Sequence, residues 1–220
     1  MTWDPARHPR DRRGRFTKSR TVKLTAAERA AGRAVIDGFS LRKFDTSQDR
    51  DAYLASAMPT LSDDQAKTVH DYAYFGYLNT NERMRSGADV SGDEMITALR
   101  AAMHPTPDDL IVSRLVRPET FAGVPDLQDL VGMKVRDAAF ASTSLGAPFD
   151  AGDNIRLRIA VPAGTPAIFV APYSKYPHEQ EILLGEGLEM AVASVRRDSE
   201  GRWDISLVVL PPGGSPPRKG

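Results

Sequence analysis

The chain of 220 residues contains no cysteine. This absence excludes a thiol nucleophile, a disulfide framework and cysteine-ligated zinc. The histidines show no metal-ligand spacing, so no metal is expected; they are His8, His70, His104 and His178. No apolar run reaches the roughly 20 residues that cross a bilayer, and no hydrophobic segment follows the basic N-terminus as in a signal peptide. We therefore expect a protein kept in a reducing cytoplasm and away from membranes, with export by a route lacking a classical signal as the alternative.

The formal charge is zero but unevenly distributed. Residues 1–20 hold seven Lys and Arg against two Asp, which leaves a net charge of −5 on the rest of the chain. This basic segment has no apolar periodicity, so we expect a flexible arm over residues 1–22. Such an arm can contact nucleic acid or an acidic protein surface, or it can be a solvated tail. Residues 211–220 are rich in Pro and Gly, and we expect a disordered tail there.

The first half of the ordered chain has helical patterns that begin at capping signals. Three pairs have the capping-box spacing: Thr25 with Glu28, Ser62 with Gln65, and Ser91 with Glu94. The pattern after Ser62 is the longest, and Gly87 is expected to end it. We expect a helical N-terminal extension over residues 23–58.

From residue 110 onward the pattern changes to short β-rich runs separated by turn residues. Predicted strands lie within 110–116, 138–144, 155–162, 167–172, 180–185, 189–197 and 203–210. Helices followed by strands in this way indicate an α+β fold.

Three polar motifs follow one another along these predicted strands: Arg114, Ser142-Thr143-Ser144 and Glu179-Gln180-Glu181. Each motif alone is commonly a salt bridge, a turn or a solvated face. Together they supply what cleavage of the nicotinamide–ribose bond of NAD needs. A carboxylate stabilises the positive charge that develops on the ribose, and a guanidinium suits a pyrophosphate. Arg117 is a second candidate for that guanidinium, although strand alternation aims it away from the face of Arg114.

The two glutamates stand two residues apart. Side chains at this spacing project from the same side of a strand. If the backbone is extended here, Glu179 and Glu181 point into one cleft, where one carboxylate can serve NAD and the other the acceptor.

The order of Arg, Ser-Thr-Ser and Glu-x-Glu resembles the mono-ADP-ribosyltransferase toxins and exoenzymes of the Arg-Ser-Glu class. The segment Tyr77–Arg85 is similar to a helical motif of that family, and 160–184 is similar to its strand, Gly turn, strand and acceptor-recognition loop. The resemblance covers residues 60–196. It implies an ADP-ribosyltransferase catalytic domain over 59–210, with N-terminal helices packed on a two-sheet, mostly antiparallel β core.

The resemblance implies a role for each residue on the NAD side. Arg114 would hold the phosphate and ribose of NAD. Ser142 would order the site beside the nicotinamide ribose, with Thr143 and Ser144 supporting its strand. Glu181 would bond the ribose 2′-hydroxyl and stabilise the oxocarbenium-like transition state. NAD enters as a substrate, and no metal is implied.

On the acceptor side, the resemblance implies that Glu179 orients or deprotonates the acceptor. Glu rather than Gln at this position is the family's pattern for arginine acceptors. A guanidinium is weakly nucleophilic until a carboxylate holds it and takes a proton. Tyr173 and Tyr176 lie on the preceding loop, where the family presents aromatic residues to its protein substrate.

These expectations define an NAD-dependent mono-ADP-ribosyltransferase acting on a protein, on arginine, with release of nicotinamide. An NAD glycohydrolase and a catalytically silent virion protein are the alternatives. The basic arm resembles short arms of phage capsid-associated proteins and phage-linked transferases. It suggests a phage-encoded enzyme carried in the virion that modifies host proteins in the host cytoplasm, and a secreted bacterial effector is the alternative origin.

Overall fold

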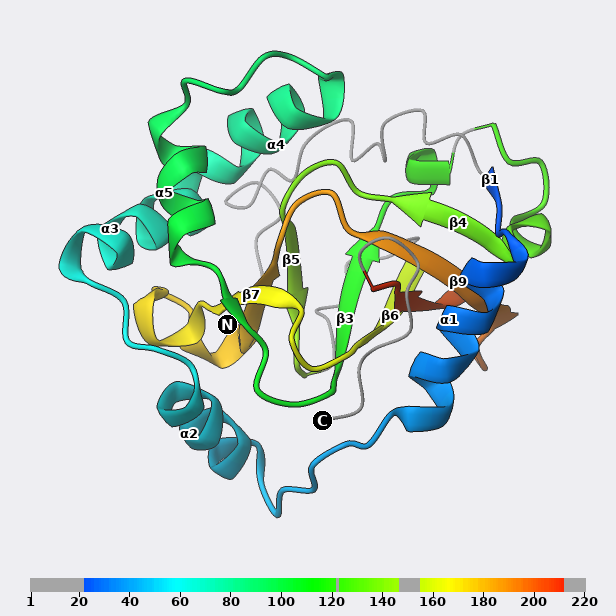
Figure 1. Ribbon diagram of the computed structural model, residues 1–220, viewed down its shortest axis with the longest axis horizontal. Coiled ribbons are helices and arrows are strands. Elements are labelled where there is room, and N and C mark those ends of the chain that lie inside the picture. The colour runs from blue at the N-terminus through cyan, green and yellow to red at the C-terminus, as the bar shows by residue number, and fades with distance from the viewer. Residues whose placement is uncertain (1–21, 122, 147–154, 212–220) are drawn as a thin grey trace.

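The computed structural model describes residues 22–121, 123–146 and 155–211 (Figure 1). The predicted basic arm, apart from its last residue, and the predicted tail beyond residue 211 lie outside these ranges. The α-helices are α1 (Ala26–Gly38), α2 (Ser47–Ala57), α3 (Asp63–Asp71), α4 (Tyr77–Ser86) and α5 (Glu94–Ala102). A π-helix, η1 (Tyr72–Gly76), joins α3 to α4, and the 3-10 helices are η2 (Pro118–Phe121), η3 (Leu127–Leu130), η4 (Ala171–Tyr173) and η5 (Pro177–Glu179). Within the described ranges, no helix combines the length and the apolar character that a bilayer span requires.

Ten strands form one continuous sheet in the order β1-β4-β9-β10-β6-β3-β5-β8-β7-β2. Their bounds are β1 (Val22–Lys23), β2 (His104–Pro105), β3 (Leu110–Val116), β4 (Met133–Arg136), β5 (Ala141–Ser144), β6 (Ile155–Val161), β7 (Pro166–Phe169), β8 (Glu181–Leu184), β9 (Glu189–Arg197) and β10 (Trp203–Val209). Among these pairs only β10 with β6 is parallel, so the predicted α+β fold with a mostly antiparallel core is confirmed, and the two predicted sheets are joined into one. The two halves of the sheet meet where β3 and β5 share a single register pair, Ser113 with Ser144.

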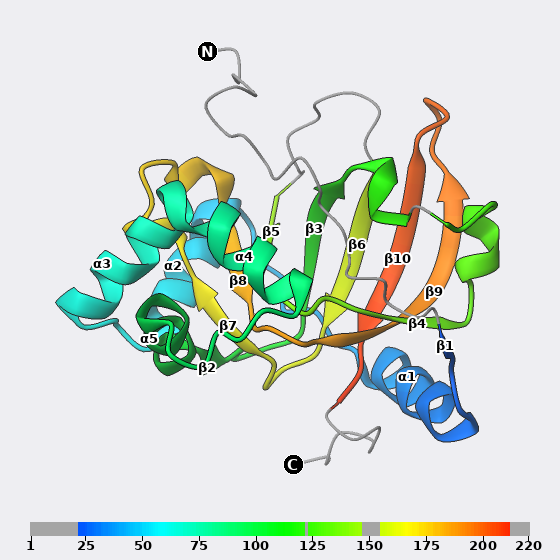
Figure 2. The same ribbon diagram turned by 90° about the horizontal axis from the view of Figure 1, so that it is seen from above.

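The helices are divided between the two halves of the sheet. Helix α1 packs against β9 and β10, while α2 to α5 gather around the β7 end (Figures 1 and 2). Helix α2 inserts the fully buried Leu54 into the largest apolar cluster. A second cluster joins α3, η1, α4 and α5 to β7 and β8, and it contains Tyr72 and the fully buried Phe140. The N-terminal helices therefore contribute to the same core as the strands.

Local capping chemistry explains most helix starts. Thr25 and Ser62 form the predicted capping boxes with Glu28 and Gln65. The prediction that Ser91 caps the next helix was wrong, because Asp93 caps α5 by accepting the backbone N–H of Ile96 at 3.0 Å. Sequence analysis also missed the capping box of Thr46 and Asp49 that opens α2.

Helix α1 is tied to the sheet through Glu28. Its carboxylate accepts Lys134 Nζ at 2.7 Å and the backbone N–H of Thr25 at 2.7 Å. These two bonds, the first above all, lower the pKa of Glu28 to about 2. A glutamate in an unfolded chain titrates at roughly 4.3. Because the folded pKa is the lower one, the stabilisation is complete above the unfolded pKa and is lost as pH falls through about 2.

We therefore expect Glu28→Gln to lower stability by about 1 kcal/mol at pH 7. The gap in melting temperature between wild type and variant should close between pH 5 and pH 2, as followed by circular dichroism. Lys134→Met removes the main donor and should show the same closing gap. A gap that stays constant over this pH range would contradict the assignment.

Candidate active site

Strands β3, β5 and β8 are neighbours in the sheet and bring the three predicted motifs together (Figure 2). Ser144 is paired with Ser113 of β3 on one side and with Glu181 of β8 on the other. Directly opposed residues of antiparallel strands project from one face, as do residues two apart in a strand. Ser142, Ser144 and Glu181 therefore share one face of the sheet at the junction of its two halves.

A buried carboxylate holds two arginines at this junction. Asp137 accepts two hydrogen bonds from Arg85 of α4, both at 3.0 Å, and one from Arg114 of β3 at 3.2 Å. The side chains of Arg85 and Asp137 are 8% and 4% exposed, and that of Arg114 is 18% exposed. Two guanidinium groups thus share one carboxylate. Arg117, the second candidate, follows β3 as an exposed residue.

The hydroxyl of Tyr72 lies among the charged groups of the site. Burial is the main reason why its pKa is raised; the negative charge of Glu181 raises it further, and the positive charges of Arg85 and Arg114 oppose the rise. Asn81 Nδ2 donates to this hydroxyl at 2.9 Å. The π-helix η1 carries Tyr72, and π-bulges are frequent at functional sites.

Asn81 offers an acceptor toward the same region. Its Oδ1 is buried without a hydrogen-bond partner among the described residues. A buried amide oxygen of this kind is costly unless a donor reaches it. Together with the two guanidinium groups and the carboxylate of Glu181, it is chemically suited to a ligand with anionic phosphates and hydroxyl or amide donors, as NAD has.

The backbone between the two glutamates is not extended. Glu179 ends the 3-10 helix η5, and Gln180 has φ 50° and ψ 45°, the only positive φ of a non-glycine residue in the described ranges. The strand-alternation argument for Glu179 and Glu181 was therefore wrong, since only Glu181 belongs to β8. The left-handed conformation costs about 1–2 kcal/mol, and the surrounding contacts must hold it.

The Ser-Thr-Ser strand is fixed to the segment of the two glutamates. Thr143 is 4% exposed, and its hydroxyl donates to the carbonyl of Ile182 at 2.7 Å. Ser144 Oγ donates to the carbonyl of Glu179 at 2.7 Å. Both hydroxyls thus bind backbone groups, whereas Ser142 lies opposite the buried Leu183 on the face of Glu181.

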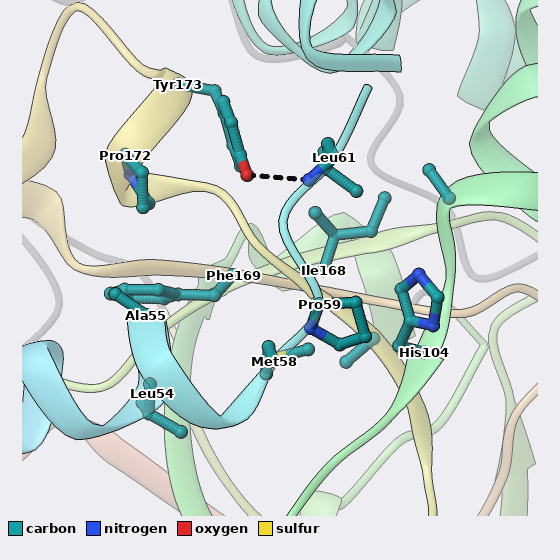
Figure 3. A pocket seen from close by; sticks show the side chains of 12 residues that line it. Leu54, Ala55, Met58, Pro59, Leu61, His104, Ile168, Phe169, Pro172 and Tyr173 are labelled. Carbon is teal, nitrogen blue, oxygen red and sulfur yellow. Dashed lines mark hydrogen bonds between the residues drawn. The ribbon is translucent and has the colours of Figure 1, made fainter. Parts of the chain in front are cut away.

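The two loop tyrosines lie in different surroundings. The Tyr173 hydroxyl accepts the backbone N–H of Leu61 at 3.1 Å, and its ring lines a small apolar pocket beside Met58 and Phe169 (Figure 3). Tyr176 lies further along the loop, with its ring edge-on to His178. Tyr173 therefore contacts the segment that connects α2 to α3.

Asp137 was missed by sequence analysis, and Arg85 was noted only as part of a helical motif. Arg85 and Asp137 stand 52 residues apart, and neither belongs to a motif whose spacing indicates a pair. Within the described ranges, no group of three or more His, Asp or Glu side chains has an arrangement that could hold a metal ion.

The sequence was compared with models of protein families. The model of the ADP-ribosyltransferase exoenzyme family matches residues 50–207. The chain therefore belongs to the ADP-ribosyltransferase exoenzyme family, a class of toxin transferases that use NAD as a substrate. The match begins within α2. No curated protein matches the sequence.

Solved structures share the fold at low sequence identity. C3stau2 from S. aureus, crystallised with NAD, is 20% identical with a TM-score of 0.67, over 78% of this chain and 99% of that one. The C3 exoenzyme of Clostridium limosum is 15% identical with a TM-score of 0.66, over 78% and 98% of the two chains. HopU1 of Pseudomonas syringae pv. Tomato DC3000 is 17% identical with a TM-score of 0.57, over 86% and 99%.

Proposed function

We propose that this protein is a mono-ADP-ribosyltransferase that transfers ADP-ribose from NAD to an arginine of a host protein. The observation that carries the proposal is the place of Glu181, which is paired with Ser144 on the face of Ser142, next to strand β3, whose Arg114 shares Asp137 with Arg85. Family membership supports the reaction, and the identity of the residue at position 179 supports the acceptor.

On the NAD side, each group has a role that follows from its charge and place. Arg114 and Arg85 bind the phosphates, because planar guanidinium groups donate in pairs and suit phosphate oxygens. Glu181 stabilises the positive charge that develops on the ribose as the bond to nicotinamide breaks. Ser142 orders the ribose, and Thr143 and Ser144 keep its strand in register with β8.

On the acceptor side, Glu179 is the general base. The arginine nitrogen bonds to the ribose carbon as nicotinamide leaves, and its proton passes to the Glu179 carboxylate. Tyr173 and Tyr176, on the loop that leads to Glu179, are the candidates for contact with the protein acceptor; the Tyr173 hydroxyl also accepts a hydrogen bond from the backbone N–H of Leu61. The role of the basic arm over residues 1–22, in contact with a phage capsid or nucleic acid, stays a prediction.

The first test replaces Glu179 by Gln, which keeps the size of the side chain and removes its basicity. We expect transfer to agmatine, a small guanidine, to fall by about a hundredfold, and nicotinamide release without an acceptor to fall far less. Mass spectrometry of the adduct and chromatography of nicotinamide measure the two reactions.

Three outcomes would contradict this assignment. Release in the wild type that is the same with and without agmatine or host lysate, and without adduct, would indicate an NAD glycohydrolase. No release under any condition would favour the silent virion protein. An unchanged rate of transfer in Glu179→Gln would exclude Glu179 as the base.

A further inference from the structure

The middle residue of the Glu-Gln-Glu motif is held from outside the site. Gln180 Oε1 accepts Arg50 Nη2 at 2.7 Å, and Gln180 Nε2 donates to Asp51 Oδ2 at 2.7 Å. Both partners belong to α2, more than 120 residues earlier in the chain. The guanidinium donates to the amide oxygen, and the carboxylate accepts from the amide nitrogen. A neighbouring cation and anion therefore match the two ends of a neutral amide. A Glu at position 180 would face Asp51, and a Lys would face Arg50.

The same guanidinium also reaches the serine strand. Arg50 Nη1 donates to the carbonyl of Leu145 at 3.1 Å, and the backbone N–H of Leu145 donates to the carbonyl of Gln180 at 3.1 Å. Leu145 directly follows Ser144, whose hydroxyl binds the carbonyl of Glu179. The result is a closed set of bonds joining α2, the end of β5 and the residue before β8.

Helix α2, which carries Arg50 and Asp51, is anchored in the core. Leu54, one turn beyond Arg50 and Asp51 on α2, is fully buried in the largest apolar cluster. Arg50 and Asp51 are themselves ion-paired at 3.3 Å, with side chains 20% and 27% exposed. Gln180 is held in the left-handed region, and its φ and ψ fix where the preceding residue, Glu179, lies relative to β8.

We propose that Arg50 and Asp51 form a clamp that positions Glu179 for the acceptor by holding the Gln180 amide. The effect of this clamp on ADP-ribose transfer depends on the proposed function of the protein. Glu181 is held independently of it, because β8 is paired with β5 and with β7. The clamp therefore matters for the acceptor half of the reaction and far less for cleavage of NAD.

The test replaces Arg50 by Ala. We expect transfer to agmatine to fall by tenfold to about a hundredfold, since a displacement of about 1 Å can cost that much, while nicotinamide release without acceptor changes by less than threefold. Arg50→Lys keeps the charge, but a lysine cannot donate to both Gln180 Oε1 and the carbonyl of Leu145 as the planar guanidinium does. This variant should therefore resemble Arg50→Ala. In a Glu179→Gln background, Arg50→Ala should add almost nothing, because both changes remove the same step.

Arg42→Ala is the matched control. Arg42 also ties the N-terminal segment to the rest of the domain, through Asp108 at 2.9 Å, but it makes no bond to Gln180. It should leave both reactions within about twofold of wild type. Equal losses of transfer and release in Arg50→Ala, full transfer in Arg50→Lys, or a loss of the same size in Arg42→Ala would overturn the clamp.

A second measurement does not depend on activity. Lys175 is exposed on the loop that ends at Gln180, so trypsin cleavage after Lys175 reports how firmly the loop is held. We expect at least fivefold faster cleavage in Arg50→Ala than in wild type or Arg42→Ala, at temperatures where all three are folded. Equal cleavage rates would overturn the clamp, whereas a wild type that neither transfers nor releases would count only against the proposed function.

Discussion

Glu181→Gln should lower nicotinamide release from NAD by a hundredfold or more. The side chain keeps its size and its place at the start of β8, opposite Ser144, but it loses the charge that we propose stabilises the positive charge developing on the ribose. Removing one well-placed stabilising group from a transition state typically costs 10²–10³ in rate, about 2.7–4 kcal/mol. Because the charge acts on the transition state more than on bound NAD, the loss should lie in kcat, with KM little changed.

Glu189→Gln is the matched control for this prediction. Glu189 is the first residue of β9 and pairs with Lys134, outside the site, with its side chain 45% exposed. It should release nicotinamide at the wild-type rate. Glu181→Gln should also keep the wild-type melting temperature to within a few degrees, so that a loss of activity cannot be ascribed to unfolding. Nicotinamide release within threefold of wild type would remove Glu181 from the reaction.

The parts of the fold that could be predicted from the sequence depend on local interactions. A capping box needs only residues three apart, so Thr25 and Ser62 mark α1 and α3 correctly. The predicted run 155–162 contains β6 (Ile155–Val161), because alternation of apolar and polar residues is a property of the strand itself. Ser91 shows the limit of this reasoning, since Asp93 offers a competing cap two residues later.

The parts of the site that could not be predicted depend on distant residues. Gln180 departs from extended backbone in an environment set by side chains on α2, and no pattern around positions 179–181 indicates them. The pairing of Arg85 and Arg114 with Asp137 likewise joins three segments whose proximity only the sheet and α4 create. The motif therefore identifies the chemical groups, while their geometry follows from tertiary contacts.

Asp137→Asn should be the most destabilising of the proposed substitutions. It is nearly isosteric, but it removes the negative charge that Arg85 and Arg114 share. Two guanidinium groups, one of them 8% exposed, would then lose the carboxylate that they share. Breaking a buried pair by removing one partner costs about 3–5 kcal/mol. For a chain of this size, that corresponds to a fall in melting temperature of roughly 10 °C or more.

Asp71→Asn separates this effect from the ordinary loss of a salt bridge. Asp71 pairs with Lys67 on the surface of α3, with side chains 39% and 77% exposed, and exposed pairs contribute less than about 1 kcal/mol. Calorimetry should therefore show a large fall for Asp137→Asn and a small one for Asp71→Asn. Well below its melting temperature, Asp137→Asn should also bind NAD more weakly by titration, since the two arginines that we propose bind the phosphates lose the carboxylate that holds them. Equal melting temperatures for the two variants would show that the arginines are compensated by other groups, and NAD affinity equal to wild type would remove Asp137 from the organisation of the site.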